Sequence, residues 1–190
     1  VALDTEFHAE RRYHPELFLV QFAFPDGRSF VVDPKVVTLD SLGPALSETL
    51  CVVHAGQQDL GILWRECGAS PQRVLDVLIA AGVLGRGYPT RLGTLVERVL
   101  SMTAPSAATL SDWATRPLSR KQLDYAISDA LILVPLRGAL MEALEGRGRL
   151  EWALAASREM AGAAQQRRTV ENRWAAWEVA AQMTTDTVQV

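Results

Sequence analysis

The chain opens with the stretch that decides its fold, Val1-Ala2-Leu3-Asp4-Thr5-Glu6-Phe7. Side chains alternate between the two faces of a strand, so a strand over residues 1–6 turns Asp4 and Glu6 to one face. Neighbouring carboxylates repel each other unless a positive group lies between them, and a divalent cation with oxygen ligands satisfies both. Taken alone, two solvated acids on an exposed edge are the simpler interpretation. A metal site is expected only where further acids join this pair.

Composition and charge indicate one domain with no membrane partner. The 190 residues are 48% hydrophobic, which suffices for one well-buried domain with an appendage. No run of about 18 apolar residues and no signal-peptide pattern occurs. Cys51 and Cys67 are the only cysteines and lack C-x-x-C spacing, so we expect neither a disulfide framework nor a zinc site. Two unpaired cysteines fit a reducing cytoplasm. The net charge of −3 excludes a module that binds nucleic acid by phosphate neutralisation alone, but not nucleic acid at a metal site.

Apolar runs separated by turn residues predict an α/β fold. Residues 17–24 and 29–33 are β-rich and flank the turn Pro25-Asp26-Gly27-Arg28, which predicts a hairpin and a three-stranded meander with the opening strand. Further strands are expected at 51–54 and 73–76, helices at 41–50, 57–67, 77–84 and 92–100, and a loop at 102–112. This order, with one β-α-β section, indicates a three-layer domain with a mixed sheet flanked by helices.

The second half of the chain is expected to be mainly helical. A long helix begins after Ser119, a suitable N-cap, and is expected to kink at Pro135. The glycines at 146 and 148 mark a boundary, so we predict a domain over residues 1–146 and a C-terminal helical extension over 147–190, with its helix at 150–182. The extension packs back on the domain, forms a dimer, or begins a longer protein.

Four acids stand where the predicted elements bring them together. Asp4 and Glu6 lie at a strand end, and Asp59 lies in the first turn of the helix at 57–67. Asp129 lies on the long helix, which has to pack on the sheet, and Tyr125 precedes it by one helical turn on the same face. These positions turn the isolated pair of the opening strand into a candidate metal site.

Three segments resemble, in order and spacing, the exonuclease motifs of the DEDD superfamily, tyrosine subtype. They are Asp4-Thr5-Glu6-Phe7, His54-Ala55-Gly56-Gln57-Gln58-Asp59-Leu60 and Tyr125-Ala126-Ile127-Ser128-Asp129. Between them, residues 13–21, 32–34 and 111–119 are similar to the connecting segments of bacterial ribonuclease D. The resemblance covers residues 1 to about 136, and the residues after Gly148 are too few for the helical HRDC domain with which that family continues.

The resemblance implies a ribonuclease H-like fold and a metal-dependent 3′-5′ exoribonuclease that hydrolyses phosphodiester bonds at RNA 3′ ends with two divalent metal ions, Mg²⁺ or Mn²⁺. It implies that Asp4, Glu6 and Asp129 hold the first ion. Asp4 would bridge to the second ion, which Asp59 would support largely through water. Tyr125 would orient the attacking water or the scissile phosphate, because an ordinary phenol pKa near 10 favours orientation over proton abstraction.

Residues beside these motifs are candidates for substrate binding: Thr5, Phe7, His54, Tyr125 and Arg116. His54 is at least equally consistent with a buried structural histidine at a strand end. Tyr13 and Phe7 are suited to stacking on bases. For Trp113 we expect core packing, and for Asp33, Asp76 and Asp112 we expect turn or cap roles.

We expect the 3′ end of a single-stranded nucleic acid as substrate, with RNA more probable than DNA. No residue identifies a reader of the RNA 2′-hydroxyl, so a 3′-5′ exonuclease acting on DNA stays open as an alternative. A catalytically silent nucleic-acid-binding module that has kept the fold also stays open, although the four acids and the tyrosine are all present. The physiological substrate, the metal used in the cell, the oligomeric state and the natural length of the protein are left open.

Overall fold

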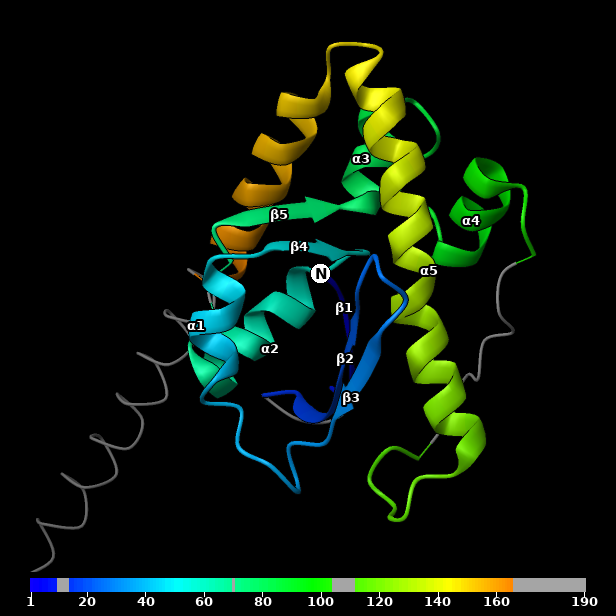
Figure 1. Cartoon of the computed structure of the whole chain (residues 1–190). Helices are drawn as coiled ribbons and strands as arrows, with labels where there is room; N and C mark the ends of the chain where they lie inside the picture. Colours follow the sequence, from blue (N-terminus) through cyan, green and yellow to red (C-terminus); the bar gives the residue numbers. More distant parts are fainter. Residues whose placement is uncertain (10–13, 70, 104–111, 166–190) are drawn as a thin grey trace, which may run out of the picture.

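The computed structural model describes residues 1–9, 14–69, 71–103 and 112–165. Its centre is a five-stranded sheet in the order β3-β2-β1-β4-β5 (Figure 1). β1 pairs antiparallel with β2 and parallel with β4, so the expected mixed sheet is confirmed and the opening strand lies at its centre. The strands are β1 (Ala2–His8), β2 (Glu16–Ala23), β3 (Ser29–Val32), β4 (Leu50–Val53) and β5 (Arg73–Asp76).

Helices cover both faces of this sheet, which confirms the expected three layers (Figure 1). One face buries Leu3 of β1 against residues of α1 and α2, including Leu63. The other face buries Ala2 of β1 against residues of α3, α4 and α5, including Leu133. The helices are α1 (Leu42–Ser47), α2 (Gln57–Cys67), α3 (Val77–Val83), α4 (Leu92–Leu100) and α5 (Arg120–Glu145).

The predicted hairpin between β2 and β3 is confirmed. Its turn has Gly27 at φ +85°, a conformation that glycine adopts without strain. The Asp26 carboxylate accepts a hydrogen bond from the Arg28 backbone N–H at 3.1 Å, which closes the turn.

A register shift interrupts the pairing of β1 with β2 directly after Glu6. Glu6 is opposite Leu19 and Phe7 is opposite Leu17, which leaves Phe18 as the extra residue of a bulge. Phe18 and Leu19 consequently pack in the same small cluster beside Trp113, on the α5 side of the sheet. The period-two pattern of the sequence did not predict this bulge.

Helix α5 continues through Pro135, where we expected a kink, without a break in the helical assignment. Proline in a helix interior costs about 3 kcal/mol. Beyond it, Leu136, Leu140 and Leu144 are all fully buried on one face of the helix. Burying each such side chain contributes about 1.5–3 kcal/mol, so continued packing outweighs the lost hydrogen bond.

The end of one predicted helix also differs from the structure. The helix expected at 41–50 ends at Ser47, because Leu50 already begins strand β4. The loop expected at 102–112 falls mostly on residues 104–111, which lie outside the described part of the chain.

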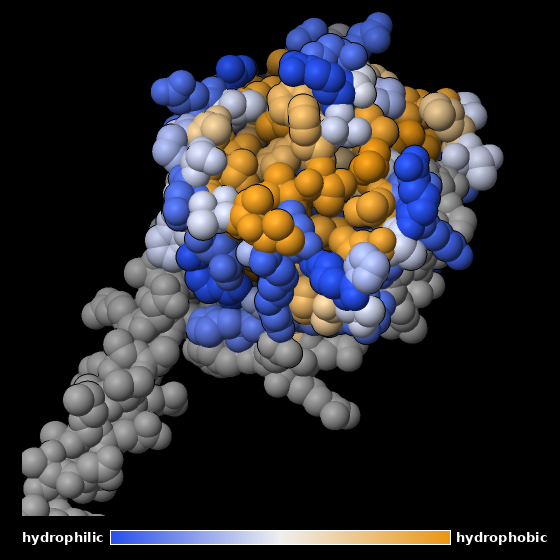
Figure 2. All heavy atoms as spheres, turned by 60° about the horizontal axis from the view of Figure 1, so that its bottom comes forward, coloured by the Kyte–Doolittle hydropathy of each residue, from blue (hydrophilic) through white to orange (hydrophobic). Residues whose placement is uncertain are grey.

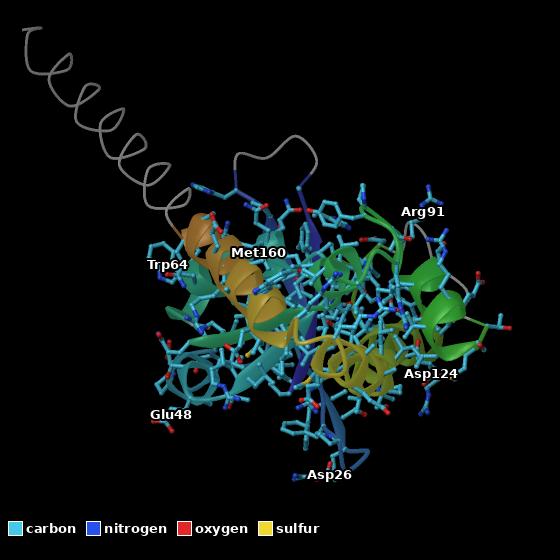
Figure 3. The ribbon with its side chains drawn as sticks, turned by 90° about the horizontal axis from the view of Figure 1, so that it is seen from above. Asp26, Glu48, Trp64, Arg91, Asp124 and Met160 are labelled. Atoms are coloured by element: carbon cyan, nitrogen blue, oxygen red, sulfur yellow. The ribbon has the colours of Figure 1, made fainter. Side chains whose placement is uncertain are left out.

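Residues 150–165 form a helix that crosses the free edge of β5. Ala153 belongs to the core cluster on one side of the sheet, and Ala161 belongs to the cluster on the other side, together with Met160 (Figure 3). Between them, the Ser157 hydroxyl accepts a hydrogen bond from the backbone N–H of Asp76 at 3.0 Å. The described part of the predicted extension therefore packs back on the domain and covers a sheet edge. The domain division at residue 146 stays a prediction.

Figure 2 shows one face of the molecule, on which hydrophobic residues gather in the middle and hydrophilic residues form the rim. Apolar atoms contribute more than half of the accessible surface of ordinary folded proteins, so this face does not by itself mark a site. Within the described residues, no helix is both long and apolar enough to span a membrane.

Replacing Asp76 tests the junction between β4, β5 and the last helix. Its buried carboxylate accepts hydrogen bonds from the backbone N–H groups of Ala55, Gly56 and Leu78. We expect Asp76→Ala to lower the free energy of unfolding in urea by about 3 kcal/mol or more, because buried donors lose a charged acceptor. Asp26→Ala, in the exposed hairpin turn, is the control and should change the urea midpoint far less. Equal effects of the two substitutions would contradict this account.

Candidate active site

The opening strand turns Asp4 and Glu6 to one face, as its alternation predicted, and this face is the one that helix α5 covers. Ala2 packs in the cluster on the α5 side, whereas Leu3 packs in the cluster on the α2 side. Thr5 also points to the α2 side, where its hydroxyl donates a hydrogen bond to the carboxylate of Asp59. The two acids of β1 therefore share the face that α5 covers.

Asp59 reaches β1 because the chain turns sharply between β4 and α2. A Cβ atom at Gly56 would lie 2.4 Å from Cγ2 of Val53, so only glycine fits this turn. The carboxylate of Asp76 holds the turn by accepting from the backbone N–H of Gly56 at 2.9 Å. Helix α2 then begins at Gln57 and carries the buried Asp59 in its first turn.

Asp129 and Tyr125 are brought to the same place by α5. The helix begins with a capping box, in which Ser119 and Gln122 satisfy each other's backbone N–H groups. Ala126, one turn before Ala130, is fully buried like that residue, and these small side chains let α5 lie close to β1 and β2. The Tyr125 ring is supported by Trp113, whose ring centroid lies 6.3 Å away.

Charge interactions link the two acids of β1 to Asp59 and Asp129. Burial raises the pKa of Asp4 well above its usual value, and the charges of Asp59, Glu6 and Asp129 raise it further. Burial likewise raises the pKa of Glu6 to about 8, with Asp129 and Asp59 adding to the shift. Carboxylates from β1, α2 and α5 therefore lie close enough to disfavour one another's ionisation.

Burial also raises the pKa values of Asp59, Asp129 and Tyr125. Burial raises the pKa of Asp59 to about 6, while the hydrogen bond from Thr5 acts in the opposite direction. Burial raises the pKa of Asp129, and the neighbouring Tyr125 hydroxyl opposes this as a donor. The Tyr125 pKa is raised by burial and then by Asp129, so the phenol keeps its proton at neutral pH.

The donor set fits divalent cations. Four carboxylates in one partly buried place supply the oxygen ligands that Mg²⁺ and Mn²⁺ prefer, and a cation would relieve their repulsion. In the described residues, however, no three His, Cys, Asp or Glu side chains form a preformed metal cage. One reason is that Asp59 is turned toward the Thr5 hydroxyl. A cation at this site would draw the Asp59 carboxylate away from Thr5 and toward Asp4 and Glu6.

Three of the predicted substrate contacts lie beside this site in supporting positions. The His54 ring Nε2 lies 3.2 Å from the carbonyl oxygen of Thr90, and burial lowers its pKa, which favours the structural interpretation of this histidine. Thr5 is buried and bonded to Asp59, and Phe7 packs against the cluster on the α2 side. Direct contact of these residues with substrate stays a prediction.

Arg116, the last of the five predicted contacts, is engaged within the protein. Its guanidinium donates to the Asp33 carboxylate and to the Trp113 carbonyl, both at 2.6 Å. It also donates to the carbonyl of Phe18, the extra residue of the bulge, at 3.3 Å. The hydrogen bond from Arg116 holds the pKa of Asp33 below its usual value. These contacts give Arg116 a structural role, and phosphate binding by it stays a prediction.

The structural roles expected for nearby residues, in the core, in turns and at a helix cap, are confirmed. Trp113 is buried in the core, and Asp112 accepts from the backbone N–H of Ala114 in a turn. Asp33 likewise accepts from the backbone N–H of Lys35, and Asp76 caps helix α3. Tyr13, proposed to stack on bases, lies outside the described residues.

One buried residue of the site region was missed from the sequence. Gln21 on β2 is directly opposite Asp4 and is completely buried. Its signal was present, because it is the single polar residue in the apolar run Leu17-Phe18-Leu19-Val20-Gln21-Phe22-Ala23-Phe24.

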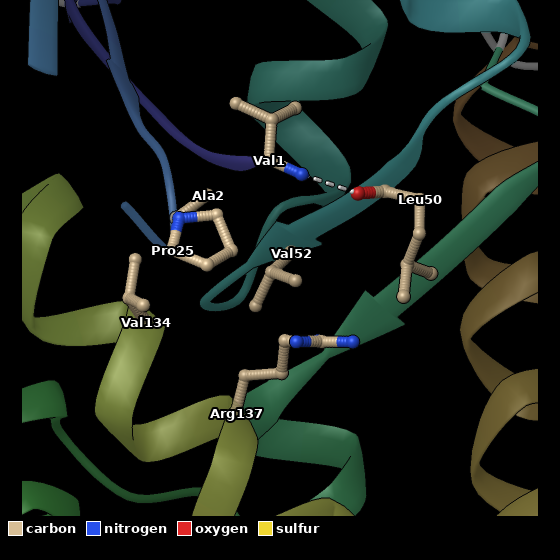
Figure 4. Close-up of a pocket in the computed structure, with 7 residues that line it drawn as sticks. All are labelled: Val1, Ala2, Pro25, Leu50, Val52, Val134 and Arg137. Atoms are coloured by element: carbon tan, nitrogen blue, oxygen red, sulfur yellow. Dashed lines mark hydrogen bonds between the residues drawn. The ribbon is translucent and has the colours of Figure 1, made fainter. Parts of the chain in front are cut away.

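A pocket of about 120 Å³ lies at the other end of β1 (Figure 4). There the Val1 amino group donates to the Leu50 carbonyl at 2.7 Å. The pocket holds no carboxylate, so it offers none of the chemistry gathered around Asp4. Its lining residues are Val1, Ala2, Pro25, Leu50, Val52, Val134 and Arg137.

Proteins of known name resemble this chain over the same region. Ribonuclease D of Sphingobium indicum is 39% identical over 158 residues, which cover 80% of this chain and 40% of that protein. The chain therefore spans about two-fifths of the length of this relative. The predicted resemblance to ribonuclease D is confirmed.

Solved structures agree with this relationship and with the expected ribonuclease H-like fold. Escherichia coli RNase D, an exoribonuclease involved in structured RNA processing, has a TM-score of 0.77 at 31% identity, covering 86% of this chain and 44% of its own. Brucella melitensis NrnC with bound Mg²⁺ has a TM-score of 0.74 at 28% identity, covering 87% and 83% of the two chains. NrnC has also been solved bound to pGG. Residues 1–145 match the sequence profile of the 3′-5′ exonuclease family, and the chain belongs to that family.

Proposed function

We propose that this domain is a metal-dependent 3′-5′ exonuclease that hydrolyses single-stranded RNA from its 3′ end. The observation that carries the proposal is the convergence of four carboxylates from three elements, in which the charges of Asp59 and Asp129 disfavour the ionisation of both Asp4 and Glu6. Membership of the 3′-5′ exonuclease family supports the reaction. RNA is favoured as substrate because ribonuclease D relatives align over most of this chain.

Asp4, Glu6, Asp59 and Asp129 would hold two divalent cations, Mg²⁺ or Mn²⁺. When bound, such ions activate the attacking water and stabilise the leaving oxygen of an in-line displacement. The bound Mg²⁺ of NrnC supports this choice of metal. Cys51 and Cys67 are free thiols, which fits the reducing cytoplasm that we propose as the compartment.

Tyr125 would orient the reacting groups with its phenol. It lies one turn before Asp129 and keeps its proton because burial raises its pKa. A protonated phenol donates a hydrogen bond, so it is suited to holding the attacking water or a phosphate oxygen. Its ring lies against the ring of Trp113. Arg116 donates a hydrogen bond to the Trp113 carbonyl and so holds this segment against the strands. This support keeps the hydroxyl in one place, which positioning in catalysis requires.

Substituting a carboxylate on α5 tests the proposed reaction. We expect Asp129→Asn to slow the degradation of a 3′-labelled single-stranded RNA by more than about 100-fold, with Mg²⁺ or Mn²⁺ present. Groups that only support a metal ligand already contribute about 10- to 100-fold to metal affinity or activity, so losing a ligand should cost more. Asp124→Asn makes the same change on the exposed face of the same helix and should leave the rate unchanged. A DNA oligonucleotide of the same sequence tests substrate choice. An inactive wild type, or equal rates for the two variants, would refute the proposal.

Removing only the phenol oxygen tests the role of Tyr125. We expect Tyr125→Phe to lower kcat by about 100-fold while the affinity for Mn²⁺ stays unchanged, because positioning is lost but no carboxylate is removed. Tyr88→Phe, at an exposed tyrosine, is the matched control. Unchanged turnover of Tyr125→Phe would show that this hydroxyl does not take part.

The burial of Glu6, together with the nearby charges of Asp129 and Asp59, predicts how stability depends on pH in the absence of metal. Glu6 has a folded pKa of about 8 against an ordinary value of 4.5, so its contribution to stability is complete below about pH 4.5 and is lost as pH rises through about 8. We expect urea unfolding with a chelator present to show this loss. Glu6→Gln should reduce this loss of stability at high pH, whereas Glu97→Gln, at an exposed position of α4, should not. Identical pH profiles for Glu6→Gln and wild type would contradict the electrostatic account.

A further inference from the structure

Gln21 is a buried polar side chain that the proposed function does not yet use. It is 0% exposed, and neither Oε1 nor Nε2 has a hydrogen-bond partner among the residues that the structure describes. Leaving a buried polar group without a partner costs about 1–3 kcal/mol. A leucine or methionine of similar size would fill the same space without this cost, so an unpartnered amide here points to a role outside packing.

The ladder between β1 and β2 places this amide beside the carboxylates. Gln21 is the register partner of Asp4. Residues directly opposite in an antiparallel pair share one face, with Cβ atoms about 4.5–5.5 Å apart. Two residues further along β2, Ala23 packs in the cluster on the α5 side, which confirms the face that Gln21 occupies. The amide thus lies under α5, next to Asp4.

We propose that Gln21 is a positioning residue whose Nε2 donates a hydrogen bond to the Asp4 carboxylate when the site holds its cations. The inference rests on the proposed function. A carboxamide is suited to this task because it donates a hydrogen bond without a charge. A lysine or arginine at the same position would compete with the cation for Asp4. Carboxylates that bind metals are commonly held by hydrogen bonds from neighbouring groups, and losing such a group weakens metal binding about 10- to 100-fold.

Gln21→Met separates this role from a purely structural one, since methionine keeps the length of the side chain and removes the donor. We expect calorimetry to show about 10- to 100-fold weaker Mn²⁺ binding than wild type. With a chelator present, the urea midpoint should be unchanged or higher, because an unpartnered amide has been removed from the core. A structural glutamine would give the opposite pair of results, a lower midpoint and unchanged Mn²⁺ affinity.

Two further variants complete the experiment. Gln72→Met makes the same change at an exposed position, directly before β5 at the far end of the sheet, and should leave the Mn²⁺ affinity unchanged. Gln21→Leu repeats the test with a second apolar side chain should the methionine variant fold poorly. Mn²⁺ affinity equal to wild type in a folded Gln21 variant overturns the inference.

The same titrations distinguish this inference from the proposed function. A wild type that binds Mn²⁺, with binding weakened by Gln21→Met, supports the role of Gln21 even if RNA is left intact, and intact RNA would then refute the exonuclease alone. A wild type that binds no Mn²⁺ overturns both proposals.

Discussion

Carboxylates crowded into a partly buried site repel one another, and this constraint shapes the whole structure. Two unit charges about 4 Å apart repel by about 4 kcal/mol at an effective dielectric constant of about 20. Whole domains are stable by only about 5–15 kcal/mol, so several such charges cannot remain together uncompensated. Protons or cations have to neutralise Asp4, Glu6, Asp59 and Asp129. Burial raises the pKa of each of them, and neighbouring carboxylates add to the shifts of Asp4 and Glu6.

Hydrogen bonds in the surrounding fold hold together the elements that carry the four acids. The Asp76 carboxylate fixes the turn from which α2 carries Asp59 toward β1. On the other side, Arg116 joins the bulge of β2 to the segment that leads into α5, and so supports Tyr125 and Asp129. Ser157 of the last helix bonds to the backbone of Asp76 at the sheet edge. Each of these hydrogen bonds is buried or half-buried and joins segments that lie far apart in the chain.

Local patterns in the sequence sufficed for much of this arrangement. Alternation along β1 predicted that Asp4 and Glu6 share a face, and helical spacing predicted that Tyr125 and Asp129 share a face. The N-cap at Ser119 and the stop at Gly68 were visible because capping depends on one or two residues.

The features that escaped prediction depend on tertiary partners. At the bulge, the Phe18 carbonyl accepts a hydrogen bond from Arg116, which lies about a hundred positions away in the sequence. Likewise, the burial of Gln21 follows from the neighbouring strand and from α5, not from its own segment. The sequence led us to expect Arg116 at the substrate, because nothing in its local sequence indicates its ion pair with Asp33.

Anomalous diffraction from crystals soaked in Mn²⁺ tests the central claim most directly, because it locates the ions independently of activity. The account predicts two anomalous peaks among the carboxylates, with Asp4 contacting both ions. An absence of peaks there, or manganese bound only at acids elsewhere on the surface, would contradict it.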